Sequence, residues 1–423
     1  MKFTSTRGQA PAVGLSAAIR NGAAPDGGLY LPEAIPQVAL DPALPLPEFA
    51  AQMLAPFFAD DALAPALSAI CAEAFTFPVP VVTPDPARPG MRALELFHGP
   101  TGAFKDFGAR FLAACFARLG EPLTILAATS GDTGGAVGAA TEGRANLRTL
   151  ILYPKGRVSP FQAHQLGCWG APVQALEVAG DFDDCQRLVK AAFADPDLSA
   201  RHRLTSANSI NIGRLLPQMA YLGWAAAQVH AETGVMPGLT IPTGNLGHGF
   251  AALHARAMGL PIGPVVLATN ANRTLTDWAV TGRYEPRPAI ATIANAMDVG
   301  APSNFERLAA TDLGEVDVAL VDDDAIRARI VAEEQASNYV WCPHSAAAAE
   351  TYARLAPEAR EARPWLLCAT AHPYKFADVV ALLIGRPLEP PPALAAILHR
   401  EARAIPIPAT SAALAEVLAS TAP

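Results

Sequence analysis

The chain of 423 residues has few charged and few aromatic side chains, and no segment concentrates positive charge. Charged residues make up 17% of the chain and aromatic residues 7%, with a net charge of −8. A phosphate backbone attracts basic surfaces, so we expect no nucleic-acid partner. No run approaches 18 apolar residues, and the N-terminus lacks the apolar centre of a signal peptide. We therefore expect no membrane span and a cytoplasmic protein.

Cysteine is also scarce and scattered. The chain has no C-x-x-C pair and no spacing typical of metal ligands. Such thiols are usually reduced and packed as small apolar groups, so the sequence predicts neither a disulfide framework nor a metal site. The six cysteines are Cys71, Cys115, Cys168, Cys185, Cys342 and Cys368.

Lysine is rarer than arginine, and one lysine stands in an unusual place. Of 31 cationic residues only five are lysines: Lys2, Lys105, Lys155, Lys190 and Lys375. Lys105 lies between Phe104 and Phe107 in the stretch LFHGPTGAFKDFG, which ends a turn and opens an apolar helix. Desolvation there lowers the pKa of an amine, and a neutral lysine can form a Schiff base with a carbonyl. Taken alone, the stretch favours the alternative, a lysine at a helix start whose amine reaches solvent.

Short apolar runs alternate with alanine-rich helical stretches from about Arg92 onward, which predicts two or three domains of α/β architecture with mostly parallel sheets. Ligands of such sheets bind at the carboxyl ends of the strands. The helical stretches include Phe182–Ala194 and Leu215–His230. The expected strands are Ala93–Phe97, Thr124–Ala128, Thr149–Tyr153, Val173–Val178, Leu239–Pro242, Val265–Thr269 and Trp365–Ala369.

The first 90 residues differ, because they contain helical runs such as Val13–Arg20 and Leu63–Ala74 and few strands. The proline-rich segment Pro78–Pro89 is interpreted as a linker, and Leu388–Pro392 marks a second boundary. The predicted parts are an N-terminal domain (1–90), a larger cofactor-binding α/β domain (91–125 and 215–385), a smaller α/β domain (126–214) and a C-terminal segment (386–423).

A second motif, ATSGDTGG, follows the expected strand Thr124–Ala128 and opens a helix. Ser130, Asp132 and Thr133 therefore crowd a helix N-terminus, where free N–H groups favour an anion such as a carboxylate. An ordinary helix cap is the alternative, but it explains only one of the three polar residues.

A third motif, IPTGNLGHG, follows the expected strand Leu239–Pro242. Gly244 and Gly247 let successive N–H groups converge on a phosphate, although tight turns also use glycine for geometry alone. The spacing G-x-x-G-x-G is not the dinucleotide pattern. Beside a Schiff-base lysine, a compact phosphate loop indicates pyridoxal phosphate, which needs one lysine and one anion site.

Two further motifs complete the set. SANSINIGR places amides and hydroxyls before Arg214, whose guanidinium suits a phosphate. A capped helix with an exposed arginine is an equally good interpretation of this motif alone. CATAHPYKF follows the strand Trp365–Ala369 and would point Thr370 at the ligand, unless Thr370 is an ordinary turn residue.

With these motifs in this order, the chain resembles the threonine synthases, a family of pyridoxal-phosphate enzymes of fold type II. The resemblance runs from about Thr4 to Leu383 and includes APDGGLYLP (Ala24–Pro32) and NAMDV (Asn295–Val299). It implies two open, mostly parallel twisted sheets flanked by helices, with a largely helical N-terminal domain. The implied reaction is the last step of threonine biosynthesis, in which O-phospho-L-homoserine and water give L-threonine and phosphate by γ-elimination and β-hydration.

The resemblance also implies roles for single residues. Lys105 is the catalytic residue and carries the cofactor, and Thr370 faces the pyridine nitrogen. The other residues implied at the cofactor are Gly244, Asn245, Leu246, Gly247 and His248. Those implied at the substrate are Ser130, Gly131, Asp132 and Thr133, with Asn208, Ser209 and Arg214 at its phosphate.

Three positions depart from the family pattern. Phenylalanine often stands at the position of Leu246, aspartate or asparagine at that of His248, and an acidic or amide residue at that of Arg273. Leu246 leaves a backbone cradle possible. His248 either adds a cation near the phosphate or caps the helix.

Other functions fit parts of the pattern. A serine or threonine dehydratase of the same fold has no substrate phosphate to bind, so Arg214 with Asn208 and Ser209 argues against it. A phospholyase that eliminates phosphate without adding water is a second alternative, and a non-catalytic binding protein, disfavoured by Lys105, is a third. The chain is expected to act as a monomer or homodimer.

Overall fold

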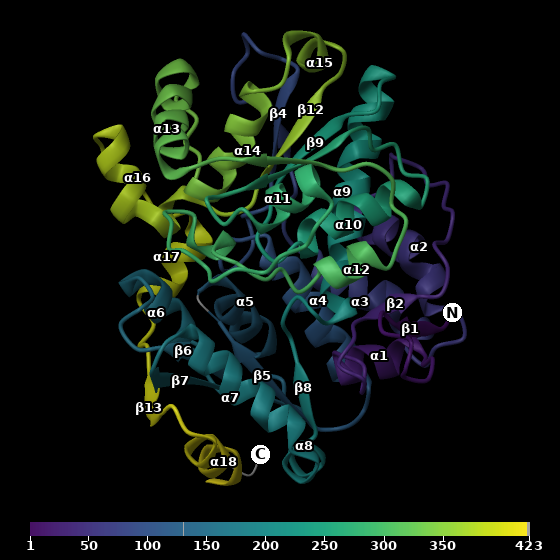
Figure 1. Ribbon diagram of the computed structural model, residues 1–423, viewed down its shortest axis with the longest axis vertical. Coiled ribbons are helices and arrows are strands. Elements are labelled where there is room, and N and C mark those ends of the chain that lie inside the picture. The colour runs from purple at the N-terminus through teal and green to yellow at the C-terminus, as the bar shows by residue number, and fades with distance from the viewer. Residues whose placement is uncertain (130, 421–423) are drawn as a thin grey trace.

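The computed structural model describes residues 1–129 and 131–420. Two open sheets dominate it, a six-stranded one in the upper part of Figure 1 and a five-stranded one in the lower part. Helices flank both sheets. This confirms an α/β fold with two mostly parallel open sheets.

The six-stranded sheet has the order β11-β10-β9-β12-β4-β3. All neighbours are parallel except β3 and β4, which pair antiparallel. Its central strands are apolar almost throughout, as expected when helices cover both faces. The strands are β3 (Val81–Val82), β4 (Met91–Glu95), β9 (Gly238–Pro242), β10 (Val265–Thr269), β11 (Asp317–Leu320) and β12 (Trp365–Ala369).

One face of this sheet packs on α9 (Ile212–Thr233) and α10 (Gly247–Ala257), and the other on α13 (Asp323–Ser337), α14 (Pro343–Ala353) and α16 (Ala377–Ile384). Shorter helices lie in its connections: α11 (Thr274–Thr281), η2 (Asn295–Met297), α12 (Phe305–Ala309), α15 (Pro357–Glu361) and η3 (Pro373–Phe376).

The five-stranded sheet is parallel, with the order β13-β7-β6-β5-β8. Its strands are β5 (Leu123–Ala128), β6 (Leu147–Pro154), β7 (Val173–Ala179), β8 (Leu204–Ser206) and β13 (Ala404–Pro408). The helices around it are α5 (Asp132–Thr141), α6 (Pro160–Gly167), α7 (Phe182–Ala194), α8 (Pro196–His202), α17 (Pro392–Leu398) and α18 (Ser411–Ser420).

The C-terminal segment returns past α17 to this lower sheet, where β13 pairs with β7 (Figure 1). No strand was expected there. Pro406 and Pro408 hide the strand pattern, and prolines are tolerated because β13 lies at the sheet edge.

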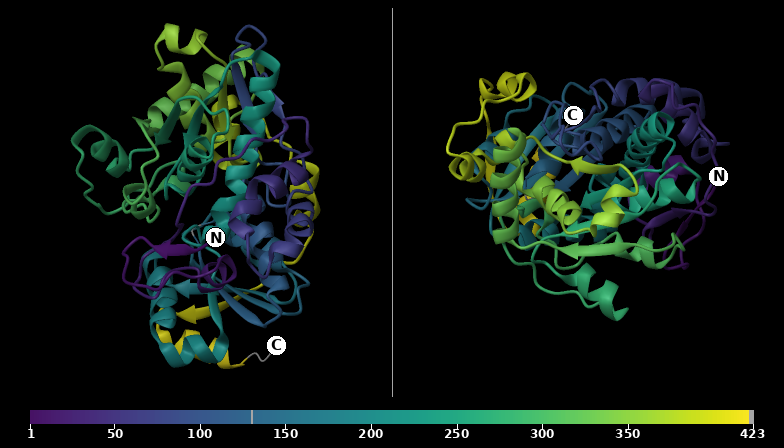
Figure 2. Two further views of the ribbon diagram at one scale, coloured as in Figure 1. Left: turned by 90° about the vertical axis from the view of Figure 1, so that its right-hand side faces the viewer. Right: turned by 90° about the horizontal axis from the view of Figure 1, so that it is seen from above.

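The N-terminal segment packs along the side of the molecule (Figure 2). Its helices share one hydrophobic core with α4 (Lys105–Arg118) and α9, to which Phe57, Phe111 and Tyr221 belong. The domain boundaries given above stay a prediction. The elements of this segment are β1 (Phe3–Ser5), α1 (Leu15–Asn21), β2 (Tyr30–Pro32), α2 (Leu46–Phe58), η1 (Ala64–Ala66) and α3 (Leu67–Ala74).

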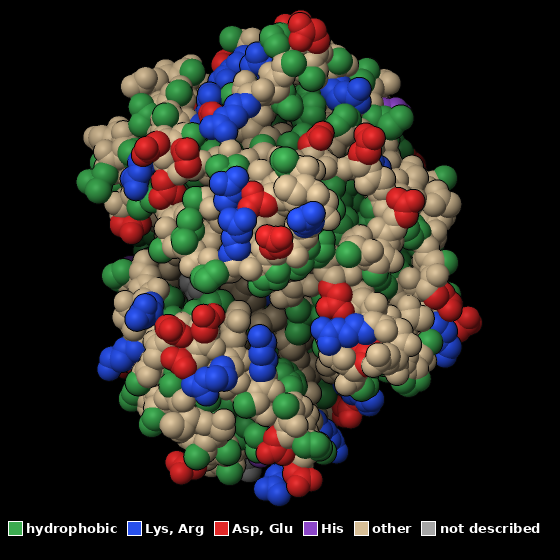
Figure 3. Space-filling view, in the orientation of Figure 1, with side chains coloured by type: hydrophobic (Ala, Val, Ile, Leu, Met, Phe, Trp, Pro, Cys, Tyr) green, Lys and Arg blue, Asp and Glu red, His purple; other side chains and the backbone are tan. Residues whose placement is uncertain are grey.

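The surface gathers no large area of one charge on the face drawn in Figure 3, where acidic and basic side chains are interspersed. Within the described residues, no helix is long and apolar enough to span a membrane. The six cysteines are free and buried.

Candidate active site

Three of the motifs lie at the carboxyl ends of three adjacent strands. β12 stands between β9 and β4 in the sheet. Thr370 follows β12, the Gly244 loop follows β9, and the turn before Lys105 follows β4. Parallel strands end at the same edge, so the fold brings these residues together.

The turn before Lys105 is held by the buried carboxylate of Asp106. Thr101 donates to Asp106 from its backbone N at 2.9 Å and from its hydroxyl at 2.6 Å. Burial raises the pKa of Asp106 to about 6, although these hydrogen bonds lower it. The turn is also tied to the β12 loop, because Phe104 N donates to Thr370 O at 2.9 Å.

Lys105 is the first residue of α4. Burial lowers the pKa of its amine and the positive charges of Arg214 and Lys375 lower it further, whereas the carboxylate of Asp132 raises it. These charges come from three elements, α9, η3 and α5. The site therefore makes the neutral amine, which is the nucleophilic form, easier to reach than it is for a lysine in water.

His248 packs beside the lysine turn. Its ring stacks on Phe104, with 4.6 Å between centroids and 20° between planes, and meets Tyr221 edge-on. Burial lowers the pKa of His248 to about 3, so the ring is neutral here. No side chain caps α10, and neither ring nitrogen bonds a described residue. The interpretation of His248 as a helix cap is therefore wrong.

The glycine loop has a strained backbone. Leu246 adopts a left-handed conformation, with φ of 63°, directly before α10 begins at Gly247. A non-glycine residue seldom adopts this conformation outside turns and functional sites. A Cβ on Gly244 would lie 2.7 Å from the Cα of Met297, so only glycine fits there.

The segment that covers Gly244 belongs to the NAMDV motif. It is anchored to α14, because Ala296 N donates to His344 Nε2 at 3.0 Å. Asp298 accepts from Asn270 at 2.7 Å, and burial raises the pKa of Asp298 to about 6. The NAMDV motif therefore packs against Gly244 and restricts the conformation of the glycine loop. Arg273 instead donates to Asp277 at 2.8 Å, where its side chain is largely exposed.

The remaining two motifs follow β5 and β8, which are neighbours in the lower sheet. Asp132 opens α5, and Gly131 before it would place a Cβ 2.6 Å from Gln162. Thr133 is partly exposed. Ser130 lies outside the described residues.

Arg214 stands in the first turn of α9, behind the N-cap Asn211. Its side chain is buried, so the interpretation as an exposed arginine is wrong. Nη1 donates to Ala207 O at 2.6 Å, and burial lowers the pKa of the guanidinium to about 10. Nε has no partner among the described residues.

Several contacts join the upper and lower sets of loops, and two of them connect one motif to another. Asn245 Nδ2 donates to Ser209 Oγ at 2.6 Å. Lys375 Nζ lies 3.0 Å from Asp132 Oδ1. The structure therefore brings the described members of all five motifs to one junction between the two sheets.

Sequence reasoning assigned no role to Lys375. Besides Asp132, its ammonium donates to Thr101 O at 2.7 Å and to Gln165 Oε1 at 2.6 Å. Its side chain is fully buried. The scarcity of lysine and its place in TAHPYKF were the signals that could have identified it.

Ser345 is a second residue that the sequence did not indicate. Thr370 N donates to Ser345 Oγ at 2.9 Å, and the two hydroxyls lie 3.5 Å apart. Thr370 is thereby held at the end of β12 with its hydroxyl in the buried junction.

The junction has the polar chemistry that pyridoxal phosphate requires. Several buried side-chain atoms next to the motifs lack a partner among the described residues: Asn208 Oδ1, Thr243 Oγ1, Asn295 Oδ1 and His344 Nδ1. Buried polar atoms are normally paired, so such a group indicates a polar ligand or ordered water. With a partly buried lysine and a glycine loop at a helix start, these residues fit the cofactor.

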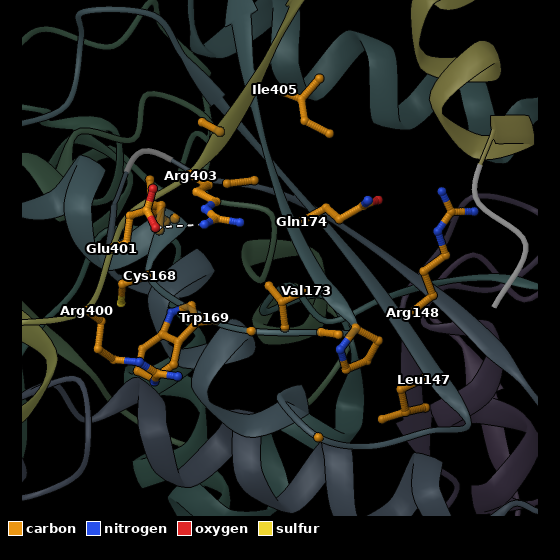
Figure 4. Close-up of a pocket in the computed structure, with 18 of the residues that line it drawn as sticks. Leu147, Arg148, Cys168, Trp169, Val173, Gln174, Arg400, Glu401, Arg403 and Ile405 are labelled. Atoms are coloured by element: carbon orange, nitrogen blue, oxygen red, sulfur yellow. Dashed lines mark hydrogen bonds and ion pairs between the residues drawn. The ribbon is translucent and has the colours of Figure 1, made fainter.

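A cavity of about 1100 Å³ lies elsewhere, near the amino ends of β6 and β7 (Figure 4). Arg400 lies over the Trp169 ring, 5.2 Å from its centroid, and Arg403 pairs with Glu401 at 2.7 Å. None of the residues expected for the site lines this cavity.

Three family models match the chain. Residues 91–370 match "Pyridoxal-phosphate dependent enzyme", residues 2–75 match "Threonine synthase N terminus", and residues 345–418 match "Threonine synthase, C-terminal". Together they span the N-terminal segment, both sheets and β13.

Individual relatives are similar over nearly their whole length. A threonine synthase of Serratia marcescens is 38% identical, covering 93% of this chain and 94% of the relative. The crystal structure of threonine synthase from Escherichia coli has a TM-score of 0.90 at 35% identity, covering 99% of this chain and 100% of that one. The PLP-bound threonine synthase structure from Brucella melitensis has the same score and identity, covering 99% and 98%.

Proposed function

Because this chain belongs to the threonine synthase family of pyridoxal-phosphate-dependent enzymes, we propose that it converts O-phospho-L-homoserine and water into L-threonine and phosphate. One observation carries the proposal beyond the family. A candidate cofactor-phosphate loop and a candidate substrate-phosphate segment meet at the Asn245–Ser209 hydrogen bond, with Lys105 beside them. Two phosphate sites and one amine are what this substrate and cofactor need.

The chain's residues divide the binding of the cofactor among three loops. Lys105 would hold its aldehyde carbon, the backbone from Gly244 to Gly247 its phosphate, and Thr370 its ring nitrogen. When bound, pyridoxal phosphate supplies a conjugated ring that accepts the electron pair left at the substrate's Cα. Thr370 offers a neutral hydroxyl, which cannot hold a proton on a ring nitrogen as firmly as a carboxylate can.

Lys105 Nζ is the group placed to move protons. Burial lowers the pKa of this amine, so Lys105 Nζ would be able to accept the Cα proton of a bound substrate and to return it. In the overall change Cβ loses a proton and gains the hydroxyl of water, while Cγ loses phosphate and gains a proton.

Arg214, Asn208 and Ser209 would hold the substrate's phosphate. The segment is pre-organised, since Arg214 is fixed on Ala207 O and Ser209 on Asn245. A guanidinium binds phosphate oxygens through two parallel N–H groups. Residues Gly131–Thr133 would face the substrate carboxylate from the N-terminus of α5.

We also propose the four-part domain division given above, a cytoplasmic location, and a monomer or homodimer as the acting unit. The expectations for His248 and Leu246 at the cofactor phosphate are retained as part of this proposal. Leu246 takes part through its backbone, and His248 through its packing on Phe104.

The proposal is tested by incubating the protein and pyridoxal phosphate with O-phospho-L-homoserine. Threonine and phosphate should form in equal amounts, and Lys105→Ala should form neither. 2-Oxobutanoate with phosphate would instead indicate a phospholyase, and reaction of L-threonine but not of the phosphorylated substrate would indicate a dehydratase.

A further inference from the structure

Lys375 is a buried cation at the point where the loops of the two sheets meet. Its ammonium contacts three segments: the lysine turn through Thr101 O, α6 through Gln165, and α5 through Asp132. Gln165 Nε2 also donates to Thr101 O at 3.0 Å, so the contacts close on one another. The ammonium donates hydrogen bonds to Thr101 O and Gln165 Oε1 and forms an ion pair with Asp132 Oδ1.

Asp132 is the only carboxylate among the charged groups that act on Lys105. The others are Arg214 from α9 and Lys375 from η3, which are cations. His344 from α14 also faces this cluster and is held neutral, since burial lowers its pKa to about 4. The charges of both Lys375 and Lys105 therefore act on the Asp132 carboxylate.

The observed distances distinguish the two lysines. Lys375 Nζ lies 3.0 Å from Asp132 Oδ1, whereas Lys105 makes no ion pair within 4 Å among the described residues. Burial alone would raise the pKa of Asp132, but Lys375, Lys105 and His344 together lower it to about 2. The carboxylate is thus ionised and already paired.

We propose that Lys375 is a positioning residue for Lys105, because it holds the Asp132 carboxylate in a pair of its own and so prevents Asp132 from keeping Lys105 as an ammonium. The inference rests on the proposed function in one respect, that Lys105 is the reactive amine. It deepens that function by explaining how the pKa of Lys105 stays lowered although the carboxylate of Asp132 raises it. The Lys375 ammonium also links the lysine turn to α5 and α6, two helices beside the five-stranded sheet.

A purely structural tie is the competing explanation. In that case removal of Lys375 loosens the junction and lowers stability, but it has no particular effect on the proton affinity of Lys105. If Lys375 instead acts through charge, its removal leaves Lys105 as the remaining lysine near an ionised carboxylate, which strengthens the ammonium form. The two explanations therefore differ in the pH dependence of one amine.

The test uses the full-length chain before pyridoxal phosphate is added. Competitive acetylation with acetic anhydride across a pH series, read by mass spectrometry, reports how much of Lys105 is neutral, with the exposed Lys190 as the internal reference. Lys375→Met should slow the labelling of Lys105 about tenfold near neutral pH, with the difference vanishing at high pH. Asp132→Asn should speed it, and Lys375→Met should have no further slowing effect in the Asp132→Asn background.

A matched control removes a lysine from an exposed pair. Lys155 Nζ lies 3.7 Å from Glu177 Oε2 beside the five-stranded sheet. Lys155→Met should leave the pH dependence of Lys105 labelling unchanged. Lys375→Met leaves a buried carboxylate unpaired and can fail to fold. In that case the Asp132→Asn variant decides, because faster labelling of Lys105 supports the inference and unchanged or slower labelling overturns it.

An unchanged Lys105 profile in a folded Lys375→Met protein also overturns the inference. If the wild-type protein still makes threonine, the proposed function survives that result. Conversely, failure to make threonine with the predicted labelling pattern would overturn the function and leave the charge relationship intact.

Discussion

The amide of Asn245 donates to the hydroxyl of Ser209 at 2.6 Å. These two residues follow strands of different sheets, β9 and β8. Asn245 is further held by Ser303 N, which donates to its Oδ1 at 2.5 Å. One side chain thus fixes the distance between the loop proposed for the cofactor phosphate and the segment proposed for the substrate phosphate.

Removing this contact should weaken substrate binding. We expect Asn245→Ala to raise the KM for O-phospho-L-homoserine about tenfold, since a hydrogen bond of this kind contributes about 1 kcal/mol and Ser303 N loses its acceptor as well. A double-mutant cycle with Ser209→Ala, read by steady-state kinetics, should give a coupling of about 1 kcal/mol. Purely additive effects would show that the contact does not connect the two phosphate sites.

Arg214→Leu should raise the KM for O-phospho-L-homoserine and leave cofactor affinity nearly unchanged. A charged hydrogen bond contributes about 1.5–3 kcal/mol, so kcat/KM should fall about tenfold to a hundredfold. Slow side reactions with unphosphorylated amino acids serve as the control, because they offer Arg214 no phosphate. Equal loss on both kinds of substrate would make Arg214 structural, through its bond to Ala207 O.

Asp106 should make the protein less stable as the pH rises. Burial raises its pKa from an ordinary 3.8 to about 6, so the folded state binds this proton more tightly than the unfolded state does. Its contribution to the free energy of unfolding is therefore greatest below about pH 4 and falls by roughly 2–3 kcal/mol by pH 6 to 7. Asp106→Asn keeps both contacts with Thr101 and stays neutral, so its melting temperature relative to wild type should rise over this range. A constant difference across the range would mean that Asp106 titrates normally.

His248 should matter for packing and little for charge. Replacement by Asn removes the stack on Phe104, which contributes about 0.5–1.5 kcal/mol, so the melting temperature should fall slightly while activity stays within a few-fold. His248→Phe keeps an aromatic ring and should retain both. Loss of pyridoxal-phosphate affinity by more than about a hundredfold in both variants, about 2.8 kcal/mol, would instead identify the imidazole as a phosphate ligand.

The sequence predicted the strands of the sheet centres well, because buried parallel strands form continuous apolar runs between helices. Phe182–Ala194 is a helix with the expected bounds, since its apolar positions recur with helical spacing. All four edge strands, β3, β8, β11 and β13, were missed. β3 and β8 have only two and three residues, β11 has no buried residue, and β13 is largely exposed and contains two prolines, so none shows a continuous apolar run of the usual length.

The site was predictable only in its separate loops. Each motif follows a strand, and that much can be inferred from the chain locally. The contacts between motifs are not local, because Lys375 and Asp132 are far apart in sequence and belong to different sheets. The burial of Arg214 could not be inferred from the sequence either, since it depends on the close approach of α4 at Gly108.

Threonine formation is tested most directly by running the reaction in oxygen-18 water. Phosphate leaves from Cγ with its original oxygen and water adds at Cβ, so the heavy oxygen should appear in the hydroxyl of threonine and not in the released phosphate. Heavy oxygen in phosphate together with homoserine would show simple hydrolysis of the ester. Unlabelled phosphate with 2-oxobutanoate and no threonine would show elimination without hydration, and either result would contradict the proposed function.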